Sequence, residues 1–156
     1  PDNTAFEILG EDLFSQRIFN YEQKNTYEIR VRSTDFGGLW IEKVFQIDIL
    51  DVNDRPVAYD QTVITPESQP VRITLTGYDE DGTDLLFTVV EQPKFGTLTG
   101  TAPNLIYTPD HRYEGLDHLR FTASDGELTS EPATVDITME SKYVADYWFP
   151  LFSFQD

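Results

Sequence analysis

The sequence predicts an all-β protein built from two tandem antiparallel Greek-key β-sandwiches, the first of which is incomplete at its N-terminus. Three observations predict this fold class. Apolar and polar residues alternate along several short segments, and clusters of glycine, proline and aspartate separate those segments. A strand–turn–strand pattern also occurs twice, roughly 90 residues apart, which is the size of one small sandwich.

The alternation is clearest in residues 27–31, where Tyr27, Ile29 and Val31 fall on one face and charged residues on the other. Such a period of two is typical of a strand that is buried on one side only. Further segments show the same pattern: 45–49, 71–75, 119–123 and 135–139.

The internal repeat defines the expected domains. Residues 29–49 match residues 119–139, because each segment has a strand that ends in aspartate, a glycine-containing turn and a final strand. A proline cannot donate a ladder hydrogen bond, so Pro56 suits the junction. We therefore expect a partial module over residues 1–56, a second module over 57–140 and a tail over 141–156.

Composition narrows the function. The net charge is −17, from 28 acidic and 11 basic residues, which disfavours binding to nucleic acid and to anionic lipid and favours cations. The chain has no cysteine, so disulfides, zinc-thiolate sites and cysteine nucleophiles are excluded. No run of 18 apolar residues is present to span a bilayer.

Oxygen-bearing side chains cluster where the first module ends. The segment "DVND" at 51–54 holds two carboxylates and an amide, "DEDG" at 79–82 holds three carboxylates, and Asp125 follows a strand. Clusters of this kind are often plain turns. They also provide the oxygen ligands that Ca²⁺ requires.

In this order the motifs resemble the second half of a cadherin repeat. The matching features are Asn20-Tyr21-Glu22, an alternating strand, Thr34-Asp35 and the "DVND" linker. The second module, up to Glu140, looks like the tandem cadherin-like or Ig-like repeats of large bacterial adhesins, because it carries "DEDG", "GTLTG", "YTP" and "SDG" elements.

Two departures from the family pattern matter. A cadherin repeat would have three strands before "FEILGEDLF", so these must come from more polypeptide or from another chain by strand addition. Asn20 replaces the usual aspartate and removes one negative charge.

The resemblance implies a Ca²⁺ site between successive repeats. It assigns the ligands to Glu22, Asp51, Asn53, Asp54, Asp79, Asp81 and Asp125. The spacing is not that of an EF-hand, which needs a glutamate at its twelfth position. We expect Asp35 and Glu67 to be ordinary solvated acids.

Nothing in the sequence predicts catalysis. No nucleophile elbow or phosphate-binding loop appears. The spacing of His111 and His118 does not suit a pair of metal ligands on one strand, so we expect both to be surface residues. Exposed aromatic residues of β-sandwiches often bind glycans, and Trp40 is the best candidate here. We favour for it a packing role at the end of the sandwich.

The tail is aromatic and belongs to neither repeat. Its density of aromatic residues suits a buried protein interface, packing on its own module or a membrane surface. The candidate partner-binding residues are Tyr147, Trp148, Phe149, Phe152 and Phe154.

These observations predict a non-enzymatic, calcium-binding adhesion, spacer or assembly module of a bacterial surface protein, at the cell surface or in the periplasm. Its partners would be other protein subunits or neighbouring repeats. Two alternatives stay open: a structural subunit held in a larger, membrane-associated complex by its tail, and a glycan-binding module of a secreted enzyme.

Overall fold

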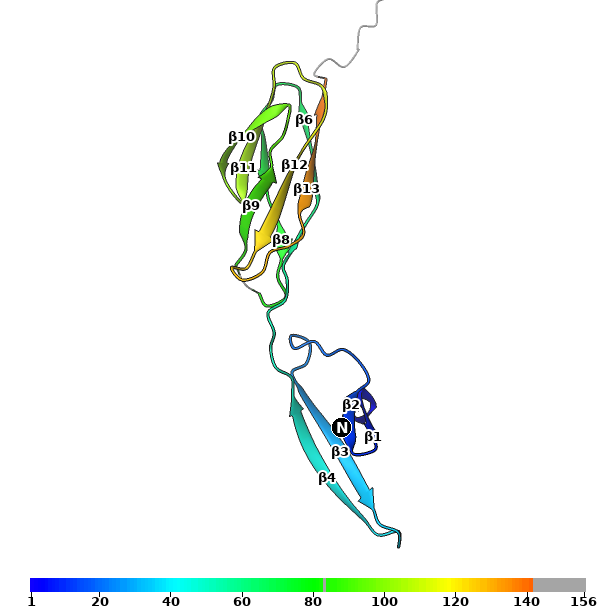
Figure 1. Ribbon diagram of the computed structural model, residues 1–156. Helices are drawn as coiled ribbons and strands as arrows, with labels where there is room; N and C mark the ends of the chain where they lie inside the picture. The colour runs from blue at the N-terminus through cyan, green and yellow to red at the C-terminus, as the bar shows by residue number, and fades with distance from the viewer. Residues whose placement is uncertain (83, 142–156) are drawn as a thin grey trace, which may run out of the picture. The chain divides into compact units, whose positions relative to one another are not determined.

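The computed structural model describes residues 1–82 and 84–141, and the tail residues proposed to bind a partner lie outside these ranges. The chain divides into two compact units, Pro1–Asp54 and a second that starts at Arg55. The all-β fold class is confirmed: the described residues form strands, and their only helical segment is the short 3₁₀ turn η1, Asn3–Ala5 (Figure 1).

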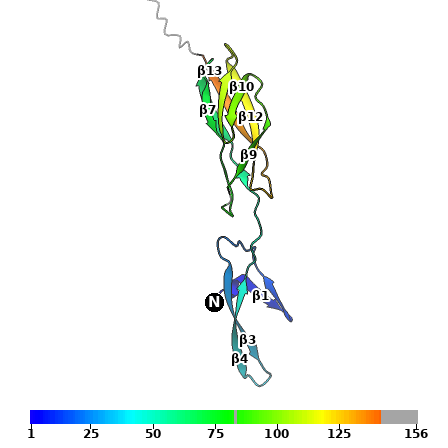
Figure 2. The same ribbon diagram turned by 90° about the vertical axis from the view of Figure 1, so that its left-hand side faces the viewer.

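The second unit is a β-sandwich of two facing sheets (Figures 1 and 2). One sheet has the order β6-β13-β12-β9 and the other the order β10-β11-β7. The strands of the first sheet are β6 Gln61–Pro66, β13 Ala133–Glu140, β12 Gly115–Ser124 and β9 Leu86–Glu91. Those of the second are β10 Gly96–Thr101, β11 Asn104–Pro109 and β7 Val71–Thr74. A two-residue ladder joins β5, Val57–Ala58, to β8, Gly77–Tyr78.

One pairing departs from the antiparallel pattern, because β6 runs parallel to β13. The side chains between the two sheets alternate along each strand as expected, and in β13 every second residue is buried. The buried core consists of Ile73, Leu75, Leu105, Tyr107, Leu119, Phe121, Ala133, Val135, Ile137 and Met139.

A buried carboxylate locks this core. Asp117 lies on the inward face of β12 and is only 4% exposed. It accepts hydrogen bonds from the backbone N–H groups of Lys94, Phe95 and His118 and from the Tyr107 hydroxyl, at 2.8–2.9 Å. Burial alone would raise the pKa of Asp117, but these donors outweigh it and hold the pKa below its usual value.

The first unit contains two separate antiparallel hairpins (Figure 1). β1, Phe6–Leu9, pairs with β2, Asp12–Ser15, and β3, Thr26–Thr34, pairs with β4, Trp40–Asp48. Gly38 turns the second hairpin with a φ of +85°, a conformation that glycine adopts at little cost.

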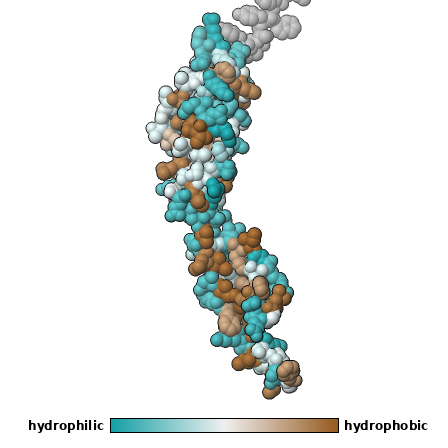
Figure 3. All heavy atoms as spheres, in the orientation of Figure 1, coloured by the Kyte–Doolittle hydropathy of each residue, from teal (hydrophilic) through white to brown (hydrophobic). Residues whose placement is uncertain are grey.

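Many apolar side chains of the first unit reach the solvent, as the brown surface in Figure 3 shows on the face drawn. The exposed fraction is 52% for Ile8, 44% for Leu13 and 42% for Phe45. Only Ala5, Tyr27 and Ile29 form a buried apolar centre within residues 1–54. Trp40 is 58% exposed and lies 4.5 Å from the Arg32 guanidinium, so the packing role expected for it is wrong.

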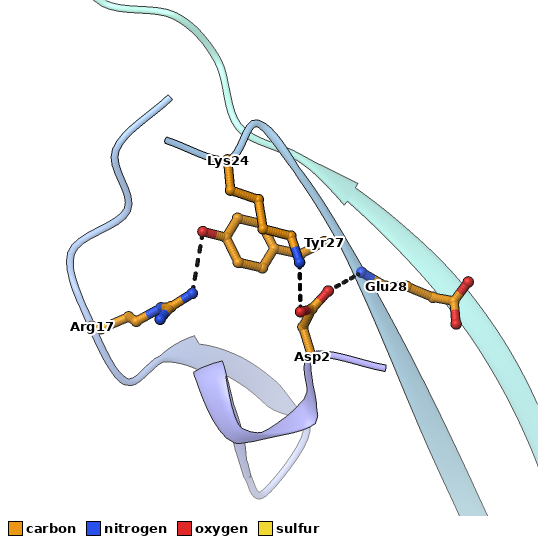
Figure 4. Close-up of polar contacts among 5 residues, drawn as sticks. All are labelled: Asp2, Arg17, Lys24, Tyr27 and Glu28. Atoms are coloured by element: carbon orange, nitrogen blue, oxygen red, sulfur yellow. Dashed lines mark hydrogen bonds and ion pairs between the residues drawn. The ribbon is translucent and has the colours of Figure 1, made fainter. Parts of the chain in front are cut away.

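Polar contacts around Tyr27 close one side of this small centre (Figure 4). Arg17 donates to the Tyr27 hydroxyl, and the Lys24 ammonium lies 2.6 Å from an Asp2 carboxylate oxygen. The other oxygen of Asp2 accepts the Glu28 backbone N–H. The hydrogen bond from Lys24 is the largest cause that holds the pKa of Asp2 below its usual value.

Candidate metal-binding residues

In the first unit, the chain segments on either side of the β3–β4 hairpin bring two of the predicted ligands together. The turn before β3 is held by Asn20, whose side-chain oxygen accepts the Gln23 N–H at 2.7 Å. The Ile49 N–H, just beyond β4, donates to the Asn25 carbonyl. This contact fixes the chain after β4 beside the turn that carries Glu22.

Glu22 and Asp51 therefore meet. Their carboxylate oxygens include a pair within 4.8 Å of each other, and both residues are exposed. Two carboxylates at this separation can coordinate one divalent cation, which would also neutralise their mutual repulsion. Exposed acidic pairs are common on proteins, so this pair alone does not define a site.

Asn53 and Asp54 follow Asp51 directly and end the first unit. The next residues enter the second unit in a fixed place, because Val57 pairs with Tyr78 in the β5–β8 ladder. Tyr78 immediately precedes Asp79. Chain connectivity thus leads the linker to the end of the second unit where Asp79 lies.

Asp79 is the most unusual of the predicted ligands. It is 5% exposed, and its Oδ1 accepts the Asp81 backbone N–H at 2.9 Å. Its Oδ2 is buried and has no hydrogen-bond partner among the described residues. A buried, negatively charged oxygen without a partner is costly, so it calls for a cation or an ordered water.

Asp81 is half-buried two residues further on, in the segment that joins β8 to β9. Asp125 follows β12 at the same end of the unit, because Ser124 pairs with Leu86, the first residue of β9. One oxygen of Asp125 accepts the Glu127 and Leu128 N–H groups, each at 2.6 Å. This turn fixes the orientation of the Asp125 carboxylate at this end of the unit.

The two remaining acids considered from the sequence lie elsewhere. Asp35 builds the β3–β4 turn, since its Oδ1 accepts the N–H groups of Gly37 and Leu39. Glu67 follows β6, where its backbone N–H donates to the Glu140 carbonyl. Neither belongs to the acidic groups described above.

Sequence reasoning missed Asp117, a buried carboxylate of β12 that accepts four hydrogen bonds. The signal was present, because Asp117 is in phase with Leu119 and Phe121 on the inward face of its strand. Its four donors leave it saturated, so its role is to hold the core and not to bind a ligand.

The fold and its acidic loops define a class: an Ig-like, cadherin-like β-sandwich protein. Residues 53–138 match the model of the bacterial Ig domain family, and the chain belongs to that family. No helix among the described residues is long and apolar enough to cross a membrane.

Curated relatives include protocadherins. The chain is 29% identical over 136 residues to Protocadherin Fat 2 of Rattus norvegicus. The aligned region covers 74% of this chain and 3% of the relative. It is 28% identical over 148 residues to Protocadherin-16 of Mus musculus, and this alignment covers 80% of this chain and 4% of that relative. The chain thus spans only a small part of the length of these relatives.

Solved structures show the same fold. Human Protocadherin-24 EC1-2 matches with a TM-score of 0.56 and 14% identity, over 92% of this chain and 79% of that one. The Protocadherin GammaB4 extracellular domain matches with a TM-score of 0.53 and 19% identity, over 86% of this chain and 26% of that one. At these identities the likeness describes the fold alone. The resemblance to cadherin-like and Ig-like repeats is confirmed.

Proposed function

We propose that this chain is a non-enzymatic, extracellular module that binds Ca²⁺ and acts as an adhesion, spacer or assembly unit of a bacterial surface protein. The observation that carries the proposal is the buried Asp79 Oδ2, which has no hydrogen-bond partner among the described residues. Coordination to a cation would give this oxygen the partner that the described protein groups do not supply.

The proposed ligands come from two places. Glu22, Asp51, Asn53 and Asp54 would contribute from the first unit and its linker, and Asp79, Asp81 and Asp125 from the second unit. Carboxylate and amide oxygens are the ligands that Ca²⁺ prefers, and it takes six to eight of them. Bound ions would reduce the repulsion within a chain of net charge −17 and restrict the linker.

Calcium titration calorimetry of the whole chain tests the proposal. We expect binding with a dissociation constant of about 10⁻⁴ to 10⁻³ M, as for other extracellular modules. Asp79→Asn should weaken it at least tenfold. The matched control Asp84→Asn, an exposed acid outside the proposed ligand set, should leave it unchanged. Equal binding by both variants would refute the assignment of Asp79.

Adhesion to other proteins is the role that this fold and these relatives support best. Protocadherins are among the relatives, and the apolar face of the first unit offers a surface for polypeptide. The contribution of the aromatic tail, from Tyr147 to Phe154, stays a prediction from the sequence. So does its use as an anchor to a larger, membrane-associated complex.

A glycan-binding role is the second candidate, and one observation favours it. Trp40 is 58% exposed beside Arg32, which in turn pairs with Glu42 at 2.7 Å. An aromatic ring flanked by hydrogen-bonding groups is a common sugar-binding arrangement. A glycan array with the wild-type chain and Trp40→Ala tests it, and binding that the substitution abolishes would support this role.

A further inference from the structure

The sandwich of the second unit has four strands at sheet edges, β6, β9, β7 and β10, and three of them carry features that oppose pairing with a further strand. β6 ends in Pro66, which has no N–H to donate. β9 ends in the charged Glu91 and shows a register shift against β12. β7 carries the charged Arg72. Charges, prolines and bulges of this kind keep sheet edges from associating.

The fourth edge strand, β10, is not protected in this way. It spans Gly96–Thr101 without a charged residue or a proline, and its pairing with β11 keeps one register throughout. Gly100 has a φ of +98°, so the regular part of the edge covers residues 96–99. β10 lies at the side of the sandwich (Figure 1), and within the described residues no strand pairs with its outer edge. Backbone groups along this edge can therefore pair with an added strand.

The same edge belongs to the longest uncharged stretch of the chain. Residues 95–109 contain no aspartate, glutamate, lysine or arginine, although 25% of all residues are charged. Because the net charge is −17, two copies of the chain repel each other. The repulsion is smallest where uncharged segments meet, so this edge is where a second copy can approach most closely.

A hollow beside β10 provides apolar surface that an added strand can bury. It has a volume of about 340 Å³, it lies between the edge strands β9 and β10, and the residues that line it are uncharged. Val89, Leu98 and Leu105 contribute apolar side chains to its wall. Leu98 also packs against the core, so it lies on the inner face of β10. A strand added to β10 would place its own inward side chains over this hollow.

We infer that two copies of this chain associate by pairing β10 of one copy with β10 of the other, antiparallel and about a twofold axis. A strand that pairs antiparallel with itself is self-complementary, as a closed dimer requires. In the pairing centred on Leu98, the two Leu98 side chains meet beside the hollows, and Thr97 of each copy lies opposite Thr99 of the other. A basic partner would be attracted to the acidic surface of the chain and not to this uncharged edge.

Sedimentation velocity of the whole chain over a range of concentrations tests the inference. We expect a reversible monomer–dimer equilibrium in chelator as well as in calcium, because β10 contains none of the proposed metal ligands. Thr99→Lys places a charge on the edge and should weaken association at least tenfold, although it lowers the net charge and hence the general repulsion. The matched control Thr88→Lys changes an exposed threonine of β9 and should not weaken association.

Two results of this experiment would overturn the inference. One is a chain that stays monomeric at every concentration, and the other is a dimer that Thr99→Lys leaves intact.

Hydrogen–deuterium exchange locates the contact independently of any substitution. Exchange of the amides in Gly96–Thr101 should slow as the protein concentration rises, whereas exchange in the other edge strand on this side, Leu86–Glu91, should stay constant. Slowing confined to Trp40–Asp48 would place the contact in the first unit and would also overturn the inference.

Discussion

The two units contain equivalent hairpins but bury them to different extents. Phe45 in the first unit is 42% exposed, whereas its counterpart Val135 in the second is fully buried. The register of β3–β4 is the same as that of β12–β13, because Ile29 pairs with Phe45 and Leu119 pairs with Val135, and this pairing and its turn are local. Burial differs because it depends on strands distant in sequence, here β6, β7 and β9. A repeat can therefore preserve its local structure without completing its core.

The acidic residues also differ in setting between the units. Glu22 and Asp51 are exposed and mutually close, whereas Asp79 is buried with an oxygen that no described group satisfies. An exposed pair is solvated by water and is tolerated without an ion. A buried orphan oxygen destabilises the fold unless a cation or water compensates for it. The second unit therefore provides the stronger indication of a metal.

The largest expected effect tests the difference in core packing. Phe121→Ala removes a fully buried ring from the second unit and should cost about 3–5 kcal/mol. Phe45→Ala removes a ring of the first unit that is 42% exposed and should cost roughly 1 kcal/mol. Urea denaturation, monitored by hydrogen exchange of the amides in β12 and in β3, measures the free energy of unfolding of the second and the first unit. Similar costs would contradict the proposed difference between the cores.

The next largest effect concerns Asp117, the buried carboxylate of the second unit. Asp117→Asn removes charge-assisted hydrogen bonds from four donors and should destabilise the second unit by about 2–3 kcal/mol at pH 7. The exposed neighbour on the adjacent strand, Asp136, provides the matched control, and Asp136→Asn should change the free energy of unfolding little.

The lowered pKa of Asp117 also predicts that the stability of the second unit falls in acid. The pKa of Asp117 is lowered in the folded state, so its stabilisation is complete above the pKa of the unfolded carboxyl group, about 3.9. It is lost as the pH falls through the lower folded-state value. Acid unfolding of Asp117→Asn should therefore lack this component. An acid transition of the second unit identical to that of the wild type would argue against the assignment.

A smaller effect sharpens the difference between the acidic residues. Asp79→Asn keeps the acceptor for the Asp81 N–H but removes the buried charge. In chelator, the melting temperature of this variant should be at least that of the wild type, because an uncompensated charge has been removed. In calcium, the variant should not gain the stability that the wild type gains. A loss of stability in chelator would show that Asp79 is satisfied without metal.

The smallest effect lies in the first unit. Lys24 lowers the pKa of Asp2, so the contact with Lys24 stabilises the fold above the unfolded carboxyl pKa and fades as the pH falls through the folded value. Asp2→Asn should slightly lower the melting temperature of the first unit at pH 7. The difference from wild type should vanish in acid. Asp12→Asn, which changes an exposed acid of β2, serves as the control.

Much of the fold could be predicted from the sequence. The period-2 pattern places Tyr27 and Ile29 inward in β3, and both are buried. The parallel pairing of β6 with β13 could not be predicted, since alternation gives no strand direction. The exposure of Trp40 was also missed, because the pattern identifies a strand face and not whether anything covers it.

The candidate metal-binding residues could likewise be predicted only in part from the sequence. Motif order alone suggested Asp79 as a ligand, but neither its burial nor its orphan oxygen can be read from "DEDG", because burial depends on how β5 and β8 pair. The position of Glu22 beside Asp51 likewise depends on a backbone contact between Ile49 and Asn25. Asp117 could have been found, because its phase in β12 points it inward.

The most direct test of the central claim is calorimetric unfolding of the whole chain in calcium and then in excess chelator. A ligand that binds only the folded state at about 100 times its dissociation constant adds about 2.7 kcal/mol. We therefore predict that calcium raises the melting temperature of the second unit by several degrees and that chelator reverses the shift. Identical melting curves in calcium and chelator would contradict the account.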